Sequence, residues 1–282
     1  MSKLPATISK SLFWLGETNL FISLAAAACT LVTYAFHDAV PDYNLVAFIF
    51  FATLLIYNLQ RRLGDFEHSA KFYNAKTILM ILATLGLIPF AIHLTYIELV
   101  GLFIAGGISI GYAVPCIPIK GKRYPIREVP YMKLWVIVLA WTLSTTVVPL
   151  IEIVDFNSVD DRISTVLFAL QQGAFIVALT IPFDVRDLKS DYLYQRTLPM
   201  VFGVQSSIRF AQNAMVAAFI FAFFNYLIGF FAFPQMLAQL GISAIGYFLV
   251  AHGKLPRKPL YYSIALDGMI LLQGIAVVWV SK

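Results

Sequence analysis

The sequence predicts an all-α protein that crosses a membrane many times, and its composition is the first reason. Sixty per cent of the 282 residues are hydrophobic, and the mean hydropathy is +0.81. Only 12% of the residues are charged, whereas soluble domains carry about a quarter. Apolar stretches of spanning length also recur along the chain. We therefore expect a single transmembrane domain over residues 1–282, in the inner membrane of a bacterium or an archaeon.

Nine apolar windows are long enough to cross a membrane. A spanning helix needs about 20 mostly apolar residues to match the hydrocarbon core of a bilayer. Pro89, Pro149 and Pro182 fall inside or near the ends of windows, where proline kinks a helix and frees carbonyl groups that neighbours must satisfy. A few residues around Tyr96 and Glu98 separate the third window from the fourth. The nine windows are residues 12–36, 44–63, 76–96, 97–115, 131–151, 163–183, 206–231, 234–251 and 258–280.

The basic residues predict the orientation in the membrane. With nine spans, eighteen of the twenty Lys and Arg residues fall on the side of the N-terminal tail, and only Arg162 and Lys282 fall on the other. This asymmetry is the positive-inside signature, so we expect the N-terminus and the basic face in the cytosol and the C-terminus outside. The net charge of +5 then reflects topology. We expect no nucleic acid among the partners, because nucleic-acid binding usually shows a concentrated patch on a soluble fold.

Three aspartates directly follow the sixth window. Asp184, Asp187 and Asp191 are three and four positions apart, so on a continuing helix they share one face. Arg186 and Lys189 lie one or two positions from an aspartate, a separation at which helical side chains do not face each other, so we expect them to be poor neutralisers. A hard divalent cation would relieve the repulsion, and Mg²⁺ is the first candidate because it binds through carboxylates and substrate phosphate. The alternative is a solvated polar helix end.

Two further linkers on the basic side carry candidate ligand-binding residues. After the second window, Asn58, Arg62 and Asp65 share a helix face, which suits either an anionic ligand or anchoring to lipid headgroups. Between the fourth and fifth windows, prolines keep a basic, tyrosine-containing linker extended, and this linker can clamp a phosphate or meet anionic lipid. Glu17 and Asp267 are candidates within the windows, because intramembrane acids are usually paired or functional. The residues of the second linker are Lys120, Lys122, Arg123, Arg127 and Lys133, with Tyr112, Tyr124 and Tyr131.

The order of these features resembles the UbiA-type intramembrane prenyltransferase superfamily. Nine spans, a polar motif after the second, a tyrosine and a basic linker after the fourth and an Asp-rich motif after the sixth follow that family's arrangement over nearly the whole chain. The most specific match is DVRDLKSDYLYQRTLPMVFG, residues 184–203. It is similar to the family's second motif, DxxDxxxD followed by a basic residue, TLP and a glycine. The resemblance implies a UbiA-like helix bundle around a central cavity.

The resemblance also implies roles for the polar residues. The three aspartates would hold Mg²⁺ against the diphosphate of an isoprenoid donor, and basic residues would lie near that diphosphate. A tyrosine and a lysine after the fourth span would complete the site. The residues implied for donor binding are Lys189, Arg196, Tyr112 and Lys120, with Lys122 or Arg123 as alternatives to Lys120 because the spacing is stretched.

The first motif departs from the family pattern NDxxDxxxD. The aligned run keeps Asn58 but has Leu59, Arg62 and Phe66 in place of the carboxylates. Asp65, one position early, is the local acid that can substitute. One hypothesis is that Arg62, a permanent cation whose planar fork suits phosphate, supplies the charge that a second Mg²⁺ normally brings. Asn58 and Arg62 therefore join the three aspartates as expected catalytic residues.

The implied activity is Mg²⁺-dependent transfer of an isoprenyl group from a prenyl diphosphate to an aromatic or lipid-like acceptor within the membrane. Metal and cations would stabilise the leaving diphosphate while the allylic chain ionises in a channel shielded from water. A terpene cyclase is one alternative. A non-catalytic relative that binds an isoprenoid or a lipid phosphate is another, favoured by the altered first motif. A secondary transporter is disfavoured, because no paired repeat of interrupted spans is visible and the acids cluster at one face.

Overall fold

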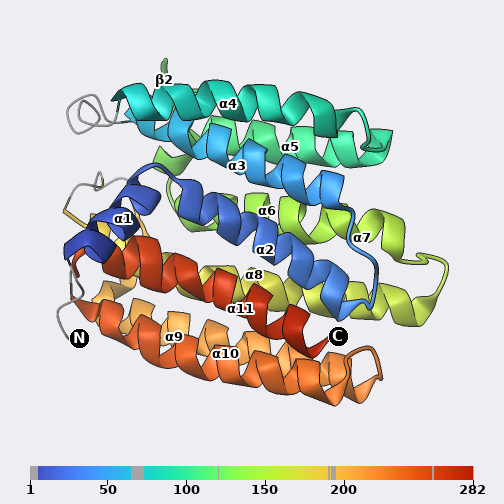
Figure 1. The fold of residues 1–282 in the computed structure, drawn as a ribbon. Coiled ribbons are helices and arrows are strands. Elements are labelled where there is room, and N and C mark those ends of the chain that lie inside the picture. The colour runs from blue at the N-terminus through green and yellow to red at the C-terminus, as the bar shows by residue number, and fades with distance from the viewer. Residues whose placement is uncertain are drawn as a thin grey trace.

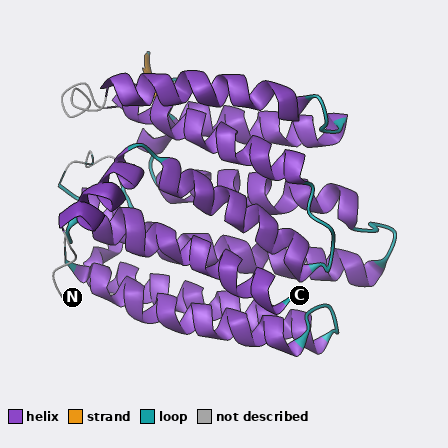
Figure 2. Cartoon of the chain, in the orientation of Figure 1, coloured by secondary structure: helices purple, strands orange, loops and turns teal. Residues whose placement is uncertain are grey.

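The structure, a computed structural model, describes residues 6–64, 73–119, 121–189, 191, 195–255 and 257–281. It is a bundle of long helices lying side by side, with one short hairpin (Figure 1, Figure 2). The α-helices are α1 (Ala6–Glu17), α2 (Leu20–Phe36), α3 (Tyr43–Gly64), α4 (Tyr73–Ala91), α5 (Tyr96–Ala113), α6 (Met132–Thr142), α7 (Val148–Ile153), α8 (Val159–Asp187), α9 (Leu198–Leu227), α10 (Phe233–Ala251) and α11 (Asp267–Val280). The other elements are the antiparallel strands β1 (Ile117–Ile119) and β2 (Lys122–Tyr124), the 3₁₀ turns η2 (Ile126–Glu128) and η5 (His252–Lys254), and the π-helical turns η3 (Leu143–Val147) and η6 (Tyr261–Leu266).

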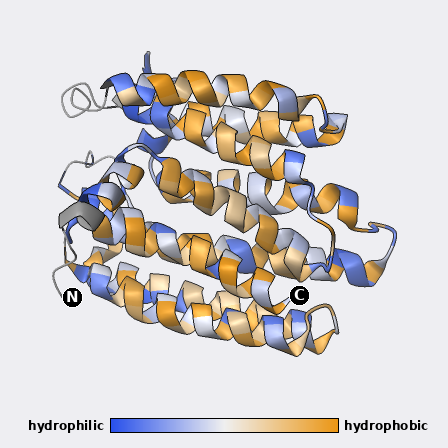
Figure 3. Ribbon diagram, viewed as in Figure 1, coloured by the Kyte–Doolittle hydropathy of each residue, from blue (hydrophilic) through white to orange (hydrophobic). Residues whose placement is uncertain are grey.

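The described helices account for all nine hydrophobic windows. Eight helical stretches are long and apolar enough to cross a membrane, and the bent pair Lys10–Glu17 and Leu20–Phe36 makes a ninth if it is one span. Apolar residues run along the helices, and polar residues gather towards their ends (Figure 3). Large apolar side chains such as Phe103 and Trp279 are 84% and 78% exposed, as expected where lipid tails surround the bundle. The all-α fold class is confirmed, and the protein is an integral membrane protein.

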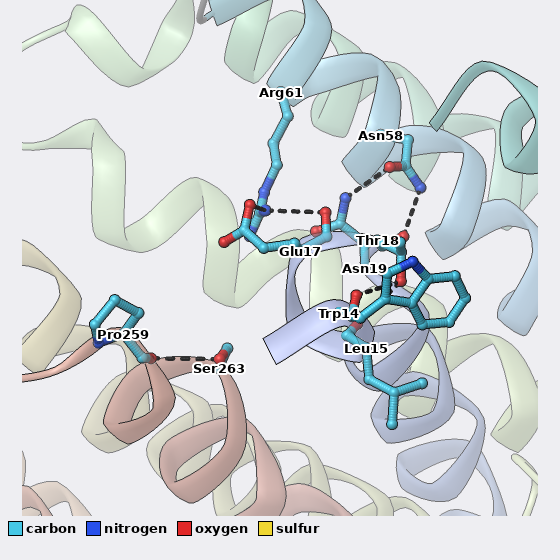
Figure 4. Close-up of polar contacts among 9 residues, drawn as sticks. All are labelled: Trp14, Leu15, Glu17, Thr18, Asn19, Asn58, Arg61, Pro259 and Ser263. Atoms are coloured by element: carbon cyan, nitrogen blue, oxygen red, sulfur yellow. Dashed lines mark hydrogen bonds and ion pairs between the residues drawn. The ribbon is translucent and has the colours of Figure 1, made fainter. Parts of the chain in front are cut away.

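The first window is broken, whereas the sequence predicts one span over residues 12–36. Helices α1 and α2 meet at 71°, and Asn19 between them has a left-handed backbone with φ 61°. Asn58 of α3 is buried against this break. Its amide nitrogen donates to the Thr18 carbonyl at 3.0 Å, and its amide oxygen accepts from the Asn19 side chain at 2.9 Å (Figure 4). Asn58 therefore stabilises the break between the two helices.

The fifth span contains a π-helical turn next to a proline. Turn η3 ends two residues before Pro149, which lies in the first turn of α7. Because proline has no N–H, the carbonyl of Thr145, four residues earlier, lacks its usual helical donor. The hydroxyl of Thr33 in α2 donates to this carbonyl at 2.8 Å. The neighbouring helix satisfies the freed group, as a membrane interior requires.

Two glycines shape the backbone on either side of the aspartate segment. Helix α8 stays helical through Pro182, and Gly253 packs against this proline. A Cβ at position 253 would come within 2.8 Å of the Pro182 Cβ, so the close approach of η5 to α8 needs glycine. After the aspartates, Gly203 has φ 76° and ψ 160°, a conformation that residues with a side chain rarely adopt. The glycine that follows TLP in the sequence pattern therefore forms a kink in α9.

Asn58→Ala should destabilise the protein. The change leaves the Thr18 carbonyl and the Asn19 amide without their partner, and a buried polar group without a hydrogen bond costs about 1–3 kcal/mol. We expect the free energy of unfolding, measured by SDS titration in mixed micelles, to fall by that amount. Asn74→Ala, at an exposed asparagine of α4, is the control and should change it by less than about 0.5 kcal/mol. Equal stability of the two variants would contradict the role given to Asn58.

Candidate functional site

The three aspartates gather where α8 ends, at the end of the bundle that carries α1 and β2 (Figure 1). Asp184 and Asp187 lie in the last turn of α8, and Asp191 follows it. The backbone N–H of Asp191 donates to the Asp187 carbonyl at 2.8 Å, so the chain keeps one further helical hydrogen bond past the end of α8. The three side chains are 2%, 26% and 14% exposed. All three carboxylates approach one point, as their spacing predicts.

A lysine from another helix occupies that point. The Nζ of Lys133 lies 3.2 Å from an oxygen of Asp184, 3.5 Å from one of Asp187 and 2.7 Å from one of Asp191. Lys133 stands in the first turn of α6 and is 8% exposed. In the sequence it is one of five basic residues of a linker, 58 positions before Asp191. Because these segments are far apart in the sequence and meet through the packing of α6 against α8, no local sequence signal identifies the partnership.

The start of α6 is tied to the segment that follows the aspartates. Tyr131, directly before α6, has a left-handed backbone with φ 67°, and its N–H donates to the carbonyl of Gln195 at 2.9 Å. Arg196 also has a positive φ, 47°, and its guanidinium donates to the Tyr131 hydroxyl at 3.3 Å. Non-glycine residues with positive φ are uncommon and persist where surrounding contacts hold them. These contacts place Lys133 opposite the aspartates.

Arg186 corrects an expectation from the sequence. It was expected to be a poor neutraliser because it is adjacent to Asp187, yet its Nε and Nη2 donate to the two Asp187 oxygens at 2.7 and 3.1 Å. Asp187 is the last residue of α8. Neighbouring side chains on a continuous helix point in different directions, but at the helix end the long Arg186 side chain can turn back to Asp187. The guanidinium carbon also lies 5.0 Å from the ring centres of Phe183 and Tyr262. Arg186 therefore connects the aspartate cluster to η6.

A second group of charged side chains lies at the same end of the bundle. Arg61 of α3 forms an ion pair with Glu17 at 3.4 Å and also donates to the Glu17 backbone carbonyl at 3.2 Å (Figure 4). Asp267, the first residue of α11, lies in the electrostatic field of both Arg61 and Arg186. The two intramembrane acids singled out in the sequence, Glu17 and Asp267, therefore both lie near arginines. The hydroxyl of Tyr57 in α3 accepts a hydrogen bond from the Trp141 indole at 3.0 Å.

The tyrosine expected at the donor site and the basic residues expected there differ in how far their side chains are exposed. Tyr112 lies near the end of α5, which packs against α6, the helix that carries Lys133, and its side chain is partly exposed. The four basic candidates that the structure describes have side chains exposed at the surface: Lys122, Arg123, Lys189 and Arg196. Lys120, like Asp65 of the first motif, lies outside the described residues. Their proposed contacts with a donor stay predictions.

The two adjacent arginines of α3 point to different neighbours. Arg61 reaches Glu17, as described above, whereas Arg62 approaches the Thr77 hydroxyl of α4 at 3.4 Å. Arg62 also lines a pocket of about 310 Å³ between α3 and α4, together with apolar residues such as Leu55 and Leu85. Asn58, the other expected catalytic residue of this motif, is engaged with the break between α1 and α2. The catalytic roles of Arg62 and Asn58 stay predictions, and Arg61 joins the candidates.

The aspartate cluster suits a hard divalent cation by its chemistry but is spaced for an ammonium group. Carboxylate oxygens are preferred ligands of Mg²⁺. The buried Oδ1 of Asp184 is at ion-pair distance from Lys133 but has no hydrogen-bond partner of good geometry, so it can accept a ligand. The described His, Cys, Asp and Glu residues include no group arranged to hold a metal ion as they stand. The oxygens lie 2.7–3.5 Å from the Lys133 nitrogen, whereas Mg²⁺ binds oxygen at about 2.0–2.1 Å.

Comparisons by sequence and by structure give different results. No family model and no curated protein matches the chain, but solved structures do. A UbiA homologue from Archaeoglobus fulgidus superimposes with a TM-score of 0.64 at 13% identity, over 94% of this chain and 99% of that one. A UbiA homologue from Archaeoglobus fulgidus bound to Cd²⁺ gives 0.58 at 14% identity, over 92% and 98%. A structure from work on digeranylgeranylglyceryl phosphate synthase in membranes gives 0.55 at 14% identity, over 96% and 98%.

These likenesses extend over nearly the full length of every chain compared. Sequence identity is too low for a sequence comparison to find them, so the evidence is the arrangement of helices. The order of the polar motifs along the chain predicts the same arrangement. The protein has the fold of the UbiA homologues.

Proposed function

We propose that the protein is a member of the UbiA-type prenyltransferase superfamily. It transfers an isoprenyl group from a prenyl diphosphate to a hydrophobic acceptor in the membrane, and it depends on Mg²⁺. The observation that carries the proposal is the convergence of Asp184, Asp187 and Asp191 within 3.5 Å of one buried cation, Lys133, in a chain with the UbiA fold. Such a convergence of acids and cations at one end of an apolar bundle suits a metal-bridged diphosphate.

The residues of this end have distinct roles in the proposed reaction. Asp184, Asp187 and Asp191 hold Mg²⁺, which would supply positive charge against the leaving diphosphate. Lys133 and Arg186 donate to phosphate oxygens that the metal does not occupy. The apolar interior keeps water from the allylic chain, which would otherwise be hydrolysed when it ionises.

The acceptor is aromatic or lipid-like in this proposal. One structure with the same fold comes from work on a digeranylgeranylglyceryl phosphate synthase in membranes, which supports a lipid-like acceptor by analogy of fold alone. Exposed apolar side chains cover the outward faces of the helices, so both substrates can reach the protein from the bilayer. We also propose that the end with the aspartates faces the cytosol, because it carries most of the basic residues.

The two native cysteines test this orientation. Cys116 is exposed at the aspartate end, between α5 and β1, and Cys29 is buried in α2. A membrane-impermeant maleimide should not label Cys116 in intact cells, because the reagent cannot reach the cytosolic face. It should label Cys116 after the membrane is opened. Cys116→Ser is the control that identifies the labelled residue. Labelling of Cys116 in intact cells would show the opposite orientation.

Asp184→Asn should abolish most of the activity. Removing one carboxylate weakens metal binding, and we expect diphosphate release to fall at least about 100-fold, equivalent to about 2.7 kcal/mol in the barrier. The assay incubates purified protein with Mg²⁺, prenyl diphosphates of several lengths and candidate acceptors. Asp160→Asn, at an exposed aspartate in the first turn of the same helix, is the control and should retain activity.

The products of that assay separate the alternatives. Diphosphate with a prenylated acceptor supports the proposal. Diphosphate with a hydrocarbon or an alcohol instead identifies a cyclase. Binding of the prenyl diphosphate without its cleavage identifies a non-catalytic relative.

Arg61→Gln and Arg62→Gln form a matched pair for the altered first motif. Arg61 forms an ion pair with Glu17 at the aspartate end, whereas Arg62 contacts α4. We expect Arg61→Gln to lower kcat/KM by about 10- to 100-fold, equivalent to about 1.4–2.7 kcal/mol, and Arg62→Gln to cause the smaller loss. The reverse order would support the role that the sequence motif assigns to Arg62.

A further inference from the structure

The position of Lys133 conflicts with that of a metal ion held by the same carboxylates. Its ammonium group lies where the three carboxylates meet, at 2.7 Å from Asp191 and 3.2 Å from Asp184. A metal ion held by the same three side chains would need this space. Mg²⁺ binds carboxylate oxygens at about 2.0–2.1 Å, so the ammonium and the metal cannot both occupy the centre of the trio.

The cluster needs a cation at all times. Asp184 is 1% exposed, and a carboxylate shielded from water is strongly destabilising unless a positive charge compensates it. Arg186 pairs with Asp187, but it does not reach the inner carboxylate of Asp184, which has Lys133 as its ion-pair partner among the described residues. In the metal-free protein, Lys133 therefore supplies the positive charge that compensates the buried Asp184 carboxylate.

Lys133 is also well suited to leave. It stands in the first turn of α6, where the helix dipole disfavours a cation, so the three carboxylates hold the ammonium there against the dipole. Lysine carries a compact charge on a flexible side chain, so it can move away from the carboxylates. An arginine would be held more firmly, because its planar guanidinium donates several hydrogen bonds in a fixed geometry. The Asp184 Oδ1 has no hydrogen bond of good geometry to lose when Lys133 moves.

We propose that Lys133 is a displaceable counter-ion of the aspartate trio. It neutralises the trio when no metal is bound, and it moves aside when a divalent cation enters. Its ammonium then binds the phosphate oxygens brought in with the metal. The last step rests on the proposed function, whereas the exchange of ammonium for metal does not. The consequence is that the free protein binds metal weakly and binds metal together with diphosphate tightly, because only the diphosphate gives Lys133 a new partner.

A metal titration tests the exchange directly. Mg²⁺ is titrated by calorimetry into the full-length chain in nanodiscs after treatment with EDTA, for the wild type and for Lys133→Met. Removing the competing ammonium should tighten Mg²⁺ binding at least about tenfold, within the range typical of coupled sites. Lys254→Met, at an exposed lysine after α10, should bind Mg²⁺ as the wild type does. Mg²⁺ binding by Lys133→Met that is equal to or weaker than that of the wild type overturns the proposal.

Inorganic pyrophosphate separates the two halves of the exchange. Added before the titration, it should tighten Mg²⁺ binding by the wild type more than by Lys133→Met, since the variant has no ammonium to transfer to the phosphate oxygens. An equal gain in both proteins overturns the transfer step. Neither titration uses a prenyl substrate, so an inactive chain can still show the exchange. An active transferase whose Mg²⁺ affinity does not change in Lys133→Met refutes the exchange alone.

The chemical reactivity of Lys133 gives a second test. It uses the wild-type protein alone, so it does not depend on whether a variant folds. Lys133 is 8% exposed and is held by three carboxylates, so an amine-acylating reagent followed by mass spectrometry should modify it slowly in EDTA. Saturating Mg²⁺ should raise its rate of modification at least about tenfold, by the same coupling, while the rate at Lys254 stays constant. An unchanged rate at Lys133 would show that the ammonium does not leave the trio, and it would overturn the proposal.

Discussion

One buried ion cluster organises the functional end of this bundle. The ammonium of Lys133 lies within 3.5 Å of three carboxylates, and none of these charges would be stable alone in surroundings poor in water. The cluster joins α6 to α8. Through the hydrogen bond from Tyr131 to Gln195 it also holds the segment that follows α8, and through Arg186 it reaches Tyr262 in η6. The geometry of the candidate site and the packing of these helices are therefore set by the same contacts.

Several polar residues within the spans have partners that the structure identifies. Some satisfy backbone groups at irregular points, as Asn58 does at the break after α1 and Thr33 does at the carbonyl freed by Pro149. A membrane interior offers no water to those groups, so a side chain must replace it. Others carry charge at the aspartate end, as Arg61 and Glu17 do in their ion pair.

The charges at the aspartate end differ from those that the motif pattern leads one to expect. The chain keeps the aspartates after α8 and lacks the carboxylates expected after the second span. Lys133, Arg186 and Arg61 are among the cations at the aspartate end. In our proposal, these cations supply part of the positive charge that faces the diphosphate. The UbiA fold is retained at 13% identity because the helix arrangement depends on apolar faces and polar ends more than on particular residues.

The sequence by itself determined that the protein lies in a lipid bilayer, where its helices fall, and that the three aspartates share one face. Composition and window length depend only on the match to a bilayer, and the spacing of Asp184, Asp187 and Asp191 depends only on the helical repeat. Only the tertiary structure decided that Lys133 is their partner, that Arg61 pairs with Glu17 whereas Arg62 contacts α4, and that Asn58 holds the bend at Asn19. The contacts of Asn58 and Lys133 join residues 39 and 58 positions apart, and the direction of each side chain depends on which helix packs beside it. Local periodicity carries no information about that choice.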